Sequence, residues 1–195
     1  MPHYFSEQQE GPVKFNEISA IARNKRFTLV VASGVFSPKK LDIGSKLLIE
    51  KCLIPPSGEI LDLGCGYGAV GVILAKTNPS LKFTLVDINR RAVLCAKKNI
   101  NLQKLDNATA KWGDLYQGLG YFDSILCNPP QTAGKMLCMQ IIDEAPAHLT
   151  KGGMLQLVVR HQKGGKSLRE EMEKVFGNVI DIAKGSGYRI YLSKH

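Results

Sequence analysis

Three residues with clear chemical potential, Asn128, Pro129 and Pro130, follow the apolar stretch FDSILC at positions 122–127. Each proline fixes its own φ and restricts the preceding residue to extended backbone, so the carbonyl groups of this NPP segment point in set directions. An amino group on a heterocyclic base is a poor nucleophile because its lone pair is delocalised into the ring. The Asn128 side-chain oxygen and the Pro129 carbonyl oxygen could accept both of its hydrogens and aim the lone pair at an electrophile. We therefore predict that the NPP segment is catalytic.

A glycine-rich loop, DLGCGYGA at positions 62–69, lies between an apolar stretch and a helical pattern. Its three glycines allow a sharp turn and a close approach to a ligand, and the following helix presents free backbone amides. Asp87 stands 23 residues after Gly64, where an acidic residue accepts hydrogen bonds from ribose hydroxyls in nucleotide-binding βαβ units. Asp114 follows the next apolar stretch and could accept from an adenine amino group. This order predicts a nucleoside site.

The glycine loop alone does not decide which nucleoside binds, because Gly64, Gly66 and Ala69 also satisfy the dinucleotide pattern G-x-G-x-x-G/A. Asp62, two residues before the first glycine, favours S-adenosylmethionine, since its carboxylate could bind the amino group of a methionine moiety directly or through water. The sulfonium methyl would then be the electrophile. The predicted cofactor-binding residues are Asp62, Gly64, Cys65, Gly66, Gly68, Asp87, Ile88, Asp114, Leu115 and Asn128.

The elements that position these residues are short apolar runs alternating with helical patterns, which is typical of βαβ units in a parallel sheet. The fold class expected is α/β, Rossmann-like and doubly wound, with a mostly parallel seven-stranded sheet and an antiparallel C-terminal strand. A GSG turn joins the last two strands as a hairpin. The expected strands cover residues 58–64, 81–89, 107–112, 122–127, 154–159, 178–184 and 188–194.

Residues 1–52 lack this alternation, although residues 26–37 favour a strand and residues 45–53 a helix. We expect them to form an N-terminal extension that packs on the core. The methyl-transfer domain is then expected to span residues 53–195.

The strings DLGCGYG, VDIN, WGDLY and NPP, in this order, resemble class I methyltransferases over residues 58–195. The stretch GVFSPKKLDIGSKLLIE at positions 34–50 further resembles the methyltransferase small domain family, which includes ribosomal RNA small subunit methyltransferase C, a guanine-N2 methyltransferase. The NPP-x-x-AGK string and the GYRIYLSK tail resemble those of compact archaeal members, to which we expect the greatest likeness. The resemblance implies methylation of an exocyclic amine of RNA, guanine N2 of small-subunit (16S) ribosomal RNA above all.

Four residues are candidates for binding the substrate. The resemblance places Phe36 near the substrate entrance, where its ring could stack on a base. Gln131 occupies the position at which related N-P-P-Y enzymes carry an aromatic residue, which weakens the case for a stacked adenine or a protein glutamine. Arg160 and His161 follow the fifth strand, at the sheet edge where open α/β folds bind ligands, and could contact phosphate.

Two alternatives keep methyl transfer but change the acceptor, and two others change the class of protein. The acceptor could be adenine N6 in nucleic acid or the N5 amide of a protein glutamine. A nicotinamide-dependent oxidoreductase is supported only by the dinucleotide pattern. The last alternative is a noncatalytic RNA-binding module that has kept the fold.

The 195 residues carry a formal net charge of +9 and a pI near 9.3, which favours a polyanionic partner such as RNA. Five cysteines without a C-x-x-C pair indicate neither a zinc site nor a disulfide framework, and the histidines show no metal-ligand spacing. No run of 18 apolar residues and no signal-peptide pattern is present in the sequence. We therefore expect a cytoplasmic protein without a metal or a membrane anchor; the oligomeric state is left open.

Overall fold

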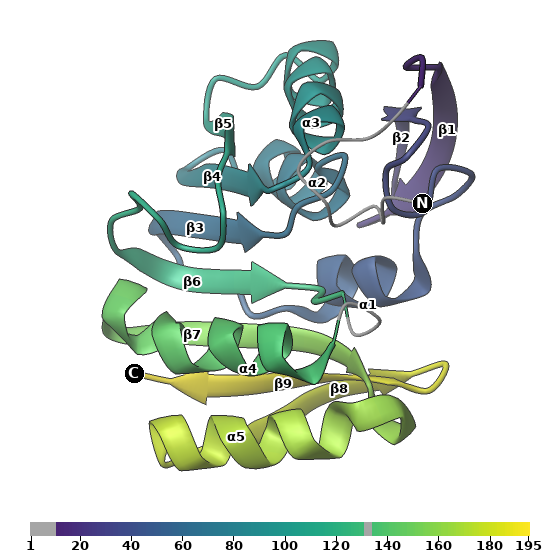
Figure 1. The fold of residues 1–195 in the computed structure, drawn as a ribbon. Helices are drawn as coiled ribbons and strands as arrows, with labels where there is room; N and C mark the ends of the chain where they lie inside the picture. Colours follow the sequence, from purple (N-terminus) through teal and green to yellow (C-terminus); the bar gives the residue numbers. More distant parts are fainter. Residues whose placement is uncertain (1–10, 131–133) are drawn as a thin grey trace.

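The computed structural model describes residues 11–130 and 134–195 (Figure 1). Within these ranges seven strands form one sheet: β3 (Gly58–Leu63), β4 (Leu81–Asp87), β5 (Ala108–Trp112), β6 (Phe122–Cys127), β7 (Leu149–Arg160), β8 (Ile180–Gly185) and β9 (Tyr188–Lys194). Their spatial order is β5-β4-β3-β6-β7-β9-β8, and β9 is antiparallel to both of its neighbours. The α/β class and the mostly parallel sheet with its closing hairpin are confirmed.

Helices cover both faces of this sheet (Figure 1). One face carries α1 (Ile43–Lys51), α2 (Ala69–Thr77) and α3 (Arg90–Leu102); the other carries α4 (Lys135–Glu144) and α5 (Lys166–Phe176). Side chains alternate between the two cores, so that Ile60 packs beneath the first layer and Leu61 beneath the second. Burial on both faces explains why the central strands read as nearly continuous apolar runs.

A separate antiparallel hairpin precedes the main sheet and consists of β1 (Phe15–Ala22) and β2 (Lys25–Ala32). The sequence predicted a strand near β2 but not β1, whose inward positions are Ile18 and two alanines and therefore show a weak apolar pattern. Its two-residue turn uses Arg23 and Asn24, both at positive φ, instead of the glycine pairs that mark such turns.

The buried side chain of Asn99 joins this hairpin to the rest of the domain. On α3, Asn99 accepts a hydrogen bond from the Val30 amide at 2.6 Å and donates to the Val30 carbonyl at 2.8 Å. It also donates to the carbonyl of Tyr67 in the glycine loop at 2.8 Å. The hairpin and α1–α3 share one apolar core, and the domain boundary at residue 52 stays a prediction.

We expect Asn99→Ala to lower the free energy of unfolding by about 3 kcal/mol, because the buried carbonyl of Tyr67 and the partly buried backbone groups of Val30 lose their partner. Urea denaturation gives the value. Gln103→Ala, at the C-cap of the same helix, is the control: it removes an exposed hydrogen bond to Thr28 and should change stability by less than about 0.5 kcal/mol. Equal losses in the two variants would contradict this role of Asn99.

Candidate active site

The site lies where β3 and β6, neighbours in the sheet, end side by side. Leu63 is opposite Cys127, so Gly64 and Asn128 leave the sheet next to each other. The chain after β3 enters α2 on one face, whereas the chain after β6 leads to α4 on the other (Figure 1). A crevice opens where neighbouring strands send their connections to opposite faces, and such crevices bind ligands in α/β sheets.

The crevice is a cleft of about 550 Å³. Most residues predicted from the sequence line it: Phe36, Asp62, Gly64, Cys65, Gly66, Asp87, Ile88, Asp114, Leu115, Asn128, Pro129, Pro130 and Arg160. The structure thus brings the predicted cofactor and acceptor residues into one space. Gln131 lies outside the described residues.

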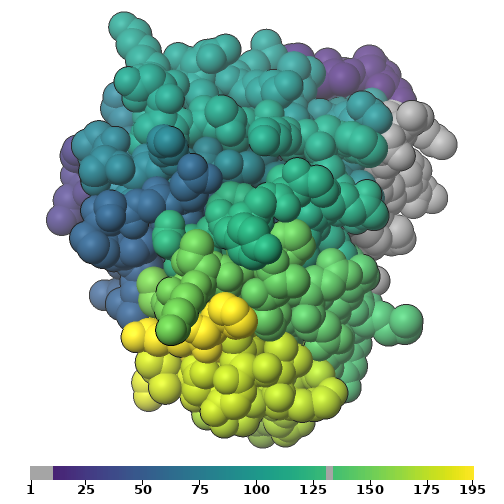
Figure 2. Space-filling view, turned by 90° about the vertical axis from the view of Figure 1, so that its left-hand side faces the viewer, coloured from purple at the N-terminus to yellow at the C-terminus, as the bar shows by residue number. Residues whose placement is uncertain are grey.

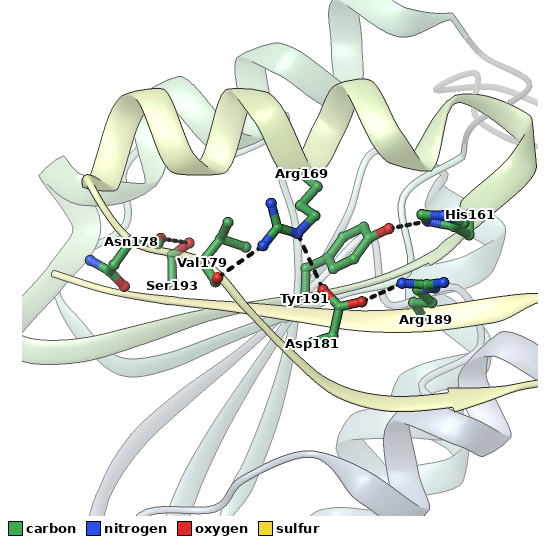
Figure 3. A network of polar contacts seen from close by, with 8 residues as sticks. All are labelled: His161, Arg169, Asn178, Val179, Asp181, Arg189, Tyr191 and Ser193. Carbon is green, nitrogen blue, oxygen red and sulfur yellow. Dashed lines mark hydrogen bonds and ion pairs between the residues drawn. The ribbon is translucent and has the colours of Figure 1, made fainter.

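Two predicted site residues, Gly68 and His161, are not in the cleft lining. Gly68 precedes α2 with φ 85°, and a Cβ there would lie 3.1 Å from side chains of Leu85 and Ala96, so it packs in the core. His161 begins a π-type turn (His161–Gly165) after β7, and its Nδ1 lies 2.5 Å from the hydroxyl of Tyr191. Figure 3 shows it beside the Asp181 network, on the α5 side of the sheet.

That network stabilises the closing hairpin. Asp181 on β8 forms ion pairs with Arg169 on α5 at 3.2 Å and with Arg189 on β9 at 2.6 Å (Figure 3). These contacts connect α5 with the last two strands, and β9 pairs with β7, at whose end Arg160 lies opposite Tyr188.

Two carboxylates face the cofactor part of the cleft. Asp62 is buried and accepts a hydrogen bond from the Gly71 amide at 2.8 Å; burial raises its pKa to about 7, and the nearby charge of Asp87 adds to the shift. Asp87 accepts from the amides of Gly66 at 2.7 Å and Asn89 at 2.8 Å. Burial raises the pKa of Asp87 to about 6 against the opposing effect of these amides. Such a pair favours a cationic ligand.

The glycine loop leaves room for that ligand. Gly64 and Gly66 have φ values of 68° and 57°, in the left-handed region that favours glycine. A Cβ added at either position would meet no atom within 4 Å and would project into open space. The loop, the two acids and the cleft volume therefore fit a nucleoside that carries positive charge, as S-adenosylmethionine does.

The far end of the cleft is fixed by a residue that we did not assign to the site. Trp112 ends β5, and its indole nitrogen donates to the Ile88 carbonyl at 2.9 Å. The guanidinium of Arg90 lies 4.2 Å from the centre of the Trp112 ring. Together they hold the backbone of Ile88, which lines the cleft beside Asp114.

The acceptor end is organised around the side-chain amide of Asn128. Its nitrogen donates to Asp42 Oδ2 at 2.9 Å and to Ser45 Oγ at 3.0 Å. Both amide hydrogens are thus directed to the start of α1, and the amide oxygen points away from it. Asp42 and Ser45 also line the cleft, but they were not predicted from the sequence as site residues. The available signal was the helix-cap pattern of LDIGS at positions 41–45.

The cysteines offer no nucleophile. All five are free and buried. Cys65 and Cys127 line the cleft, and burial raises the pKa of both thiols well above the ordinary value, which keeps them protonated at neutral pH. In the part of the chain that the structure describes, no cluster of three His, Cys, Asp or Glu side chains could hold a metal ion. No helix within residues 11–130 and 134–195 has the length and apolar character to cross a membrane.

This combination defines a class: a Rossmann-like α/β protein with a nucleoside cleft at the switch point and a rigid NPP segment on its rim. The chain belongs to the methyltransferase small domain family, whose sequence profile matches residues 26–192.

Individual relatives agree with this membership. The chain is 36% identical to the uncharacterized protein YbxB of Bacillus subtilis, over 98% of each chain. It is also 36% identical to ribosomal RNA small subunit methyltransferase C of Hamiltonella defensa, over 81% of this chain and 47% of the relative. The chain therefore spans about half the length of that methyltransferase. The expected special likeness to archaeal members is not supported, because the compact relative matched end to end is bacterial.

Among solved structures, the fold is similar to a 16S rRNA N2 methyltransferase of T. thermophilus in complex with AdoMet and guanosine. The TM-score is 0.81 at 26% identity, over 94% of this chain and 51% of the other. Family and neighbour agree that the protein is an S-adenosylmethionine-dependent methyltransferase with the Rossmann-like fold. The glycine loop alone was compatible with a dinucleotide or with S-adenosylmethionine, and the comparisons identify S-adenosylmethionine as the cofactor.

We expect the affinity for S-adenosylmethionine to rise about tenfold between pH 5.5 and 7.5, because Asp62 and Asp87 lose protons in this window. The stability of the unbound protein should change in the opposite direction to the affinity. Because both carboxyl groups have raised pKa values in the folded state, the free energy of unfolding should fall as pH rises from about 4 to 7. Calorimetric titration in buffers of different ionisation enthalpy measures both the affinity and the released protons.

Methylthioadenosine, which lacks the methionine amino group, is the matched control ligand. The affinity for methylthioadenosine should change less with pH. Asp62→Asn should leave that affinity nearly unchanged but lower the affinity for S-adenosylmethionine. Equal sensitivity of the two ligands to Asp62→Asn would contradict a contact between Asp62 and the amino group.

Proposed function

We propose that the protein methylates the exocyclic N2 amino group of a guanine in 16S ribosomal RNA, in the cytoplasm. The observation that carries the proposal is the position of Asn128-Pro129-Pro130 beside the glycine loop, within one cleft. Support also comes from relatives named ribosomal RNA small subunit methyltransferase C and from the neighbour solved with guanosine.

In this mechanism the protein orients the acceptor. The Asn128 side-chain oxygen and the Pro129 carbonyl oxygen accept the two hydrogens of the amino group, which favours a pyramidal nitrogen and directs its lone pair across the cleft toward Gly64 and Gly66. The bound cofactor supplies an electrophilic methyl group on a sulfonium. Orientation of this kind contributes roughly 7 to 11 kcal/mol to lowering a barrier. The thioether that leaves is neutral and needs no acid, and the proton that the methylated amino group loses passes to water.

The base itself must be held flat in front of Asn128. We propose that Phe36, which lines the cleft, stacks on it, and that Pro130 bounds the opposite side. A base within a helix would have to leave its stack at a cost of a few kcal/mol, which an unpaired base avoids. The target is therefore a base in a loop. A role for Gln131 in this contact stays a prediction.

Cations around the opening suit the phosphates that flank such a base. Arg160 donates to the Tyr188 hydroxyl at 2.8 Å, and its guanidinium lies 5.3 Å from the centre of the Tyr188 ring. Lys163 also lines the cleft, and Lys39 and Lys40 are exposed on the loop between Phe36 and α1. We propose phosphate contacts for this group. A phosphate role for His161 stays a prediction, since its ring bonds Tyr191.

We expect the double variant Lys39→Ala/Lys40→Ala to raise KM for RNA without changing kcat. The slope of log KM against log salt should fall by about 0.7 to 0.9 for each lost phosphate contact. The control removes the same charge with Lys104→Ala/Lys151→Ala, which are exposed just before β5 and near the start of β7. The parallel strands begin at the end of the sheet away from the cleft, on the side of the molecule that faces the viewer in Figure 2. Identical salt slopes in both double variants would argue against a basic rim at the cleft.

A panel of acceptors tests the function itself. With radiolabelled S-adenosylmethionine, we expect transfer to 16S RNA, naked or in small ribosomal subunits, and N2-methylguanosine in the nuclease digest. Transfer RNA, DNA and release factor should remain unlabelled. N6-methyladenosine or labelled glutamine in the products would instead establish the alternative acceptors.

The variant Asn128→Ala separates catalysis from binding in the same assay. We expect turnover to fall at least about a hundredfold, because a preorganised acceptor oxygen is gone, and the affinity for S-adenosylmethionine to fall far less, because the glycine loop and both acids remain. A noncatalytic RNA-binding module would show no transfer to any acceptor, and no difference between the natural chain and this variant.

A further inference from the structure

The start of α1 makes a contact with the NPP segment that no sequence motif announces. Asp42 is the N-cap of α1, and its Oδ2 accepts a hydrogen bond from the Ser45 amide at 2.9 Å. The same Oδ2 accepts a hydrogen bond from the side-chain amide of Asn128 at 2.9 Å, across 86 positions of sequence. One carboxylate oxygen therefore caps a helix and holds the proposed catalytic amide.

The two contacts of the amide nitrogen determine the orientation of the Asn128 amide group, that is, where its nitrogen and its oxygen lie. One hydrogen is donated to Asp42 and the other to Ser45 Oγ at 3.0 Å. The two ends of an amide group have similar size but opposite hydrogen-bonding roles. A rotated amide would set its oxygen against the carboxylate of Asp42 and lose two hydrogen bonds, one of them to a charged acceptor.

The helix that presents these two acceptors is itself fixed. Ser45, Leu48 and Ile49 are buried, so α1 cannot shift without disturbing the core. Gly44 lies against the ring of Tyr188, because a Cβ there would be 2.9 Å from its Cε1. Only a glycine lets the start of α1 approach this wall of the cleft so closely.

We infer that Asp42 and Ser45 are positioning residues for methyl transfer: they lock the Asn128 amide so that its oxygen, not its nitrogen, meets the amino group of the substrate. The inference rests on the proposed role of Asn128. The segment before residue 53 then contributes to the acceptor site, because without α1 the Asn128 amide has no fixed orientation.

Asp42→Ser separates the two tasks of Asp42. Serine remains a favourable N-cap but is one atom shorter, so it keeps the helix cap and loses the reach to Asn128. We expect kcat to fall about tenfold or more, with KM for RNA and the affinity for S-adenosylmethionine near their natural values, and with the melting temperature nearly unchanged. Ser45→Ala, which leaves the cap acceptor in place, should lower kcat less.

Asp42→Asn is the conservative control, because its side-chain carbonyl oxygen can accept from both the Ser45 amide and Asn128. It should restore most of the kcat that Asp42→Ser loses. Asn128→Asp should be inactive, since it sets two carboxylates against each other.

A folded Asp42→Ser variant with natural kcat would overturn the positioning role while leaving the proposed function intact.

Hydrogen exchange of the Asn128 side-chain amide tests the fixed orientation of this group, whichever acceptor is methylated. Its signal is assigned by its loss in Asn128→Ala. We expect slow exchange in the natural chain and fast exchange in both Asp42→Ser and Ser45→Ala. Equally fast exchange in all three would refute the inference even if methyl transfer to guanine is found.

Discussion

The register between β3 and β6 is the constraint on which the site depends. Because Leu63 pairs with Cys127, Gly64 and Asn128 follow directly from neighbouring strands, which lie about 4.8 Å apart. A slip of one residue would turn every side chain of one strand to the other face and separate donor and acceptor. The opposite directions of α2 and α4 then open the space between them, and the segment around α1 supplies the remaining wall.

Charge is arranged in two zones that suit two ligands of opposite sign. Inside the cleft, Asp62 and Asp87 are held by backbone amides, and both have raised pKa values, so a cation can draw them into the ionised form. The cleft is also lined by the cations Arg160 and Lys163. A sulfonium cofactor and a polyanionic acceptor can therefore occupy the same cleft from different sides.

The sequence predicted the sheet, the glycine loop, its acids and the NPP segment because each has a local pattern. It missed β1, whose alternation relies on small alanines and whose turn lacks glycine. It missed Asp42, because a cap pattern indicates a helix start but not a contact with Asn128, 86 positions away. It placed His161 at the correct sheet edge but could not show that the turn after β7 directs its ring to Tyr191.

The central claim is that a fixed pair of oxygens at the end of β6 faces the donor and receives an amino group. A crystal structure with S-adenosylhomocysteine and guanosine tests it most directly. We expect the base nitrogen N2 within about 2.7 to 3.2 Å of both the Asn128 side-chain oxygen and the Pro129 carbonyl, with the amide nitrogen still bonded to Asp42. A complex in which the amide nitrogen faces the base, or in which N2 points away from the sulfur, would contradict the account.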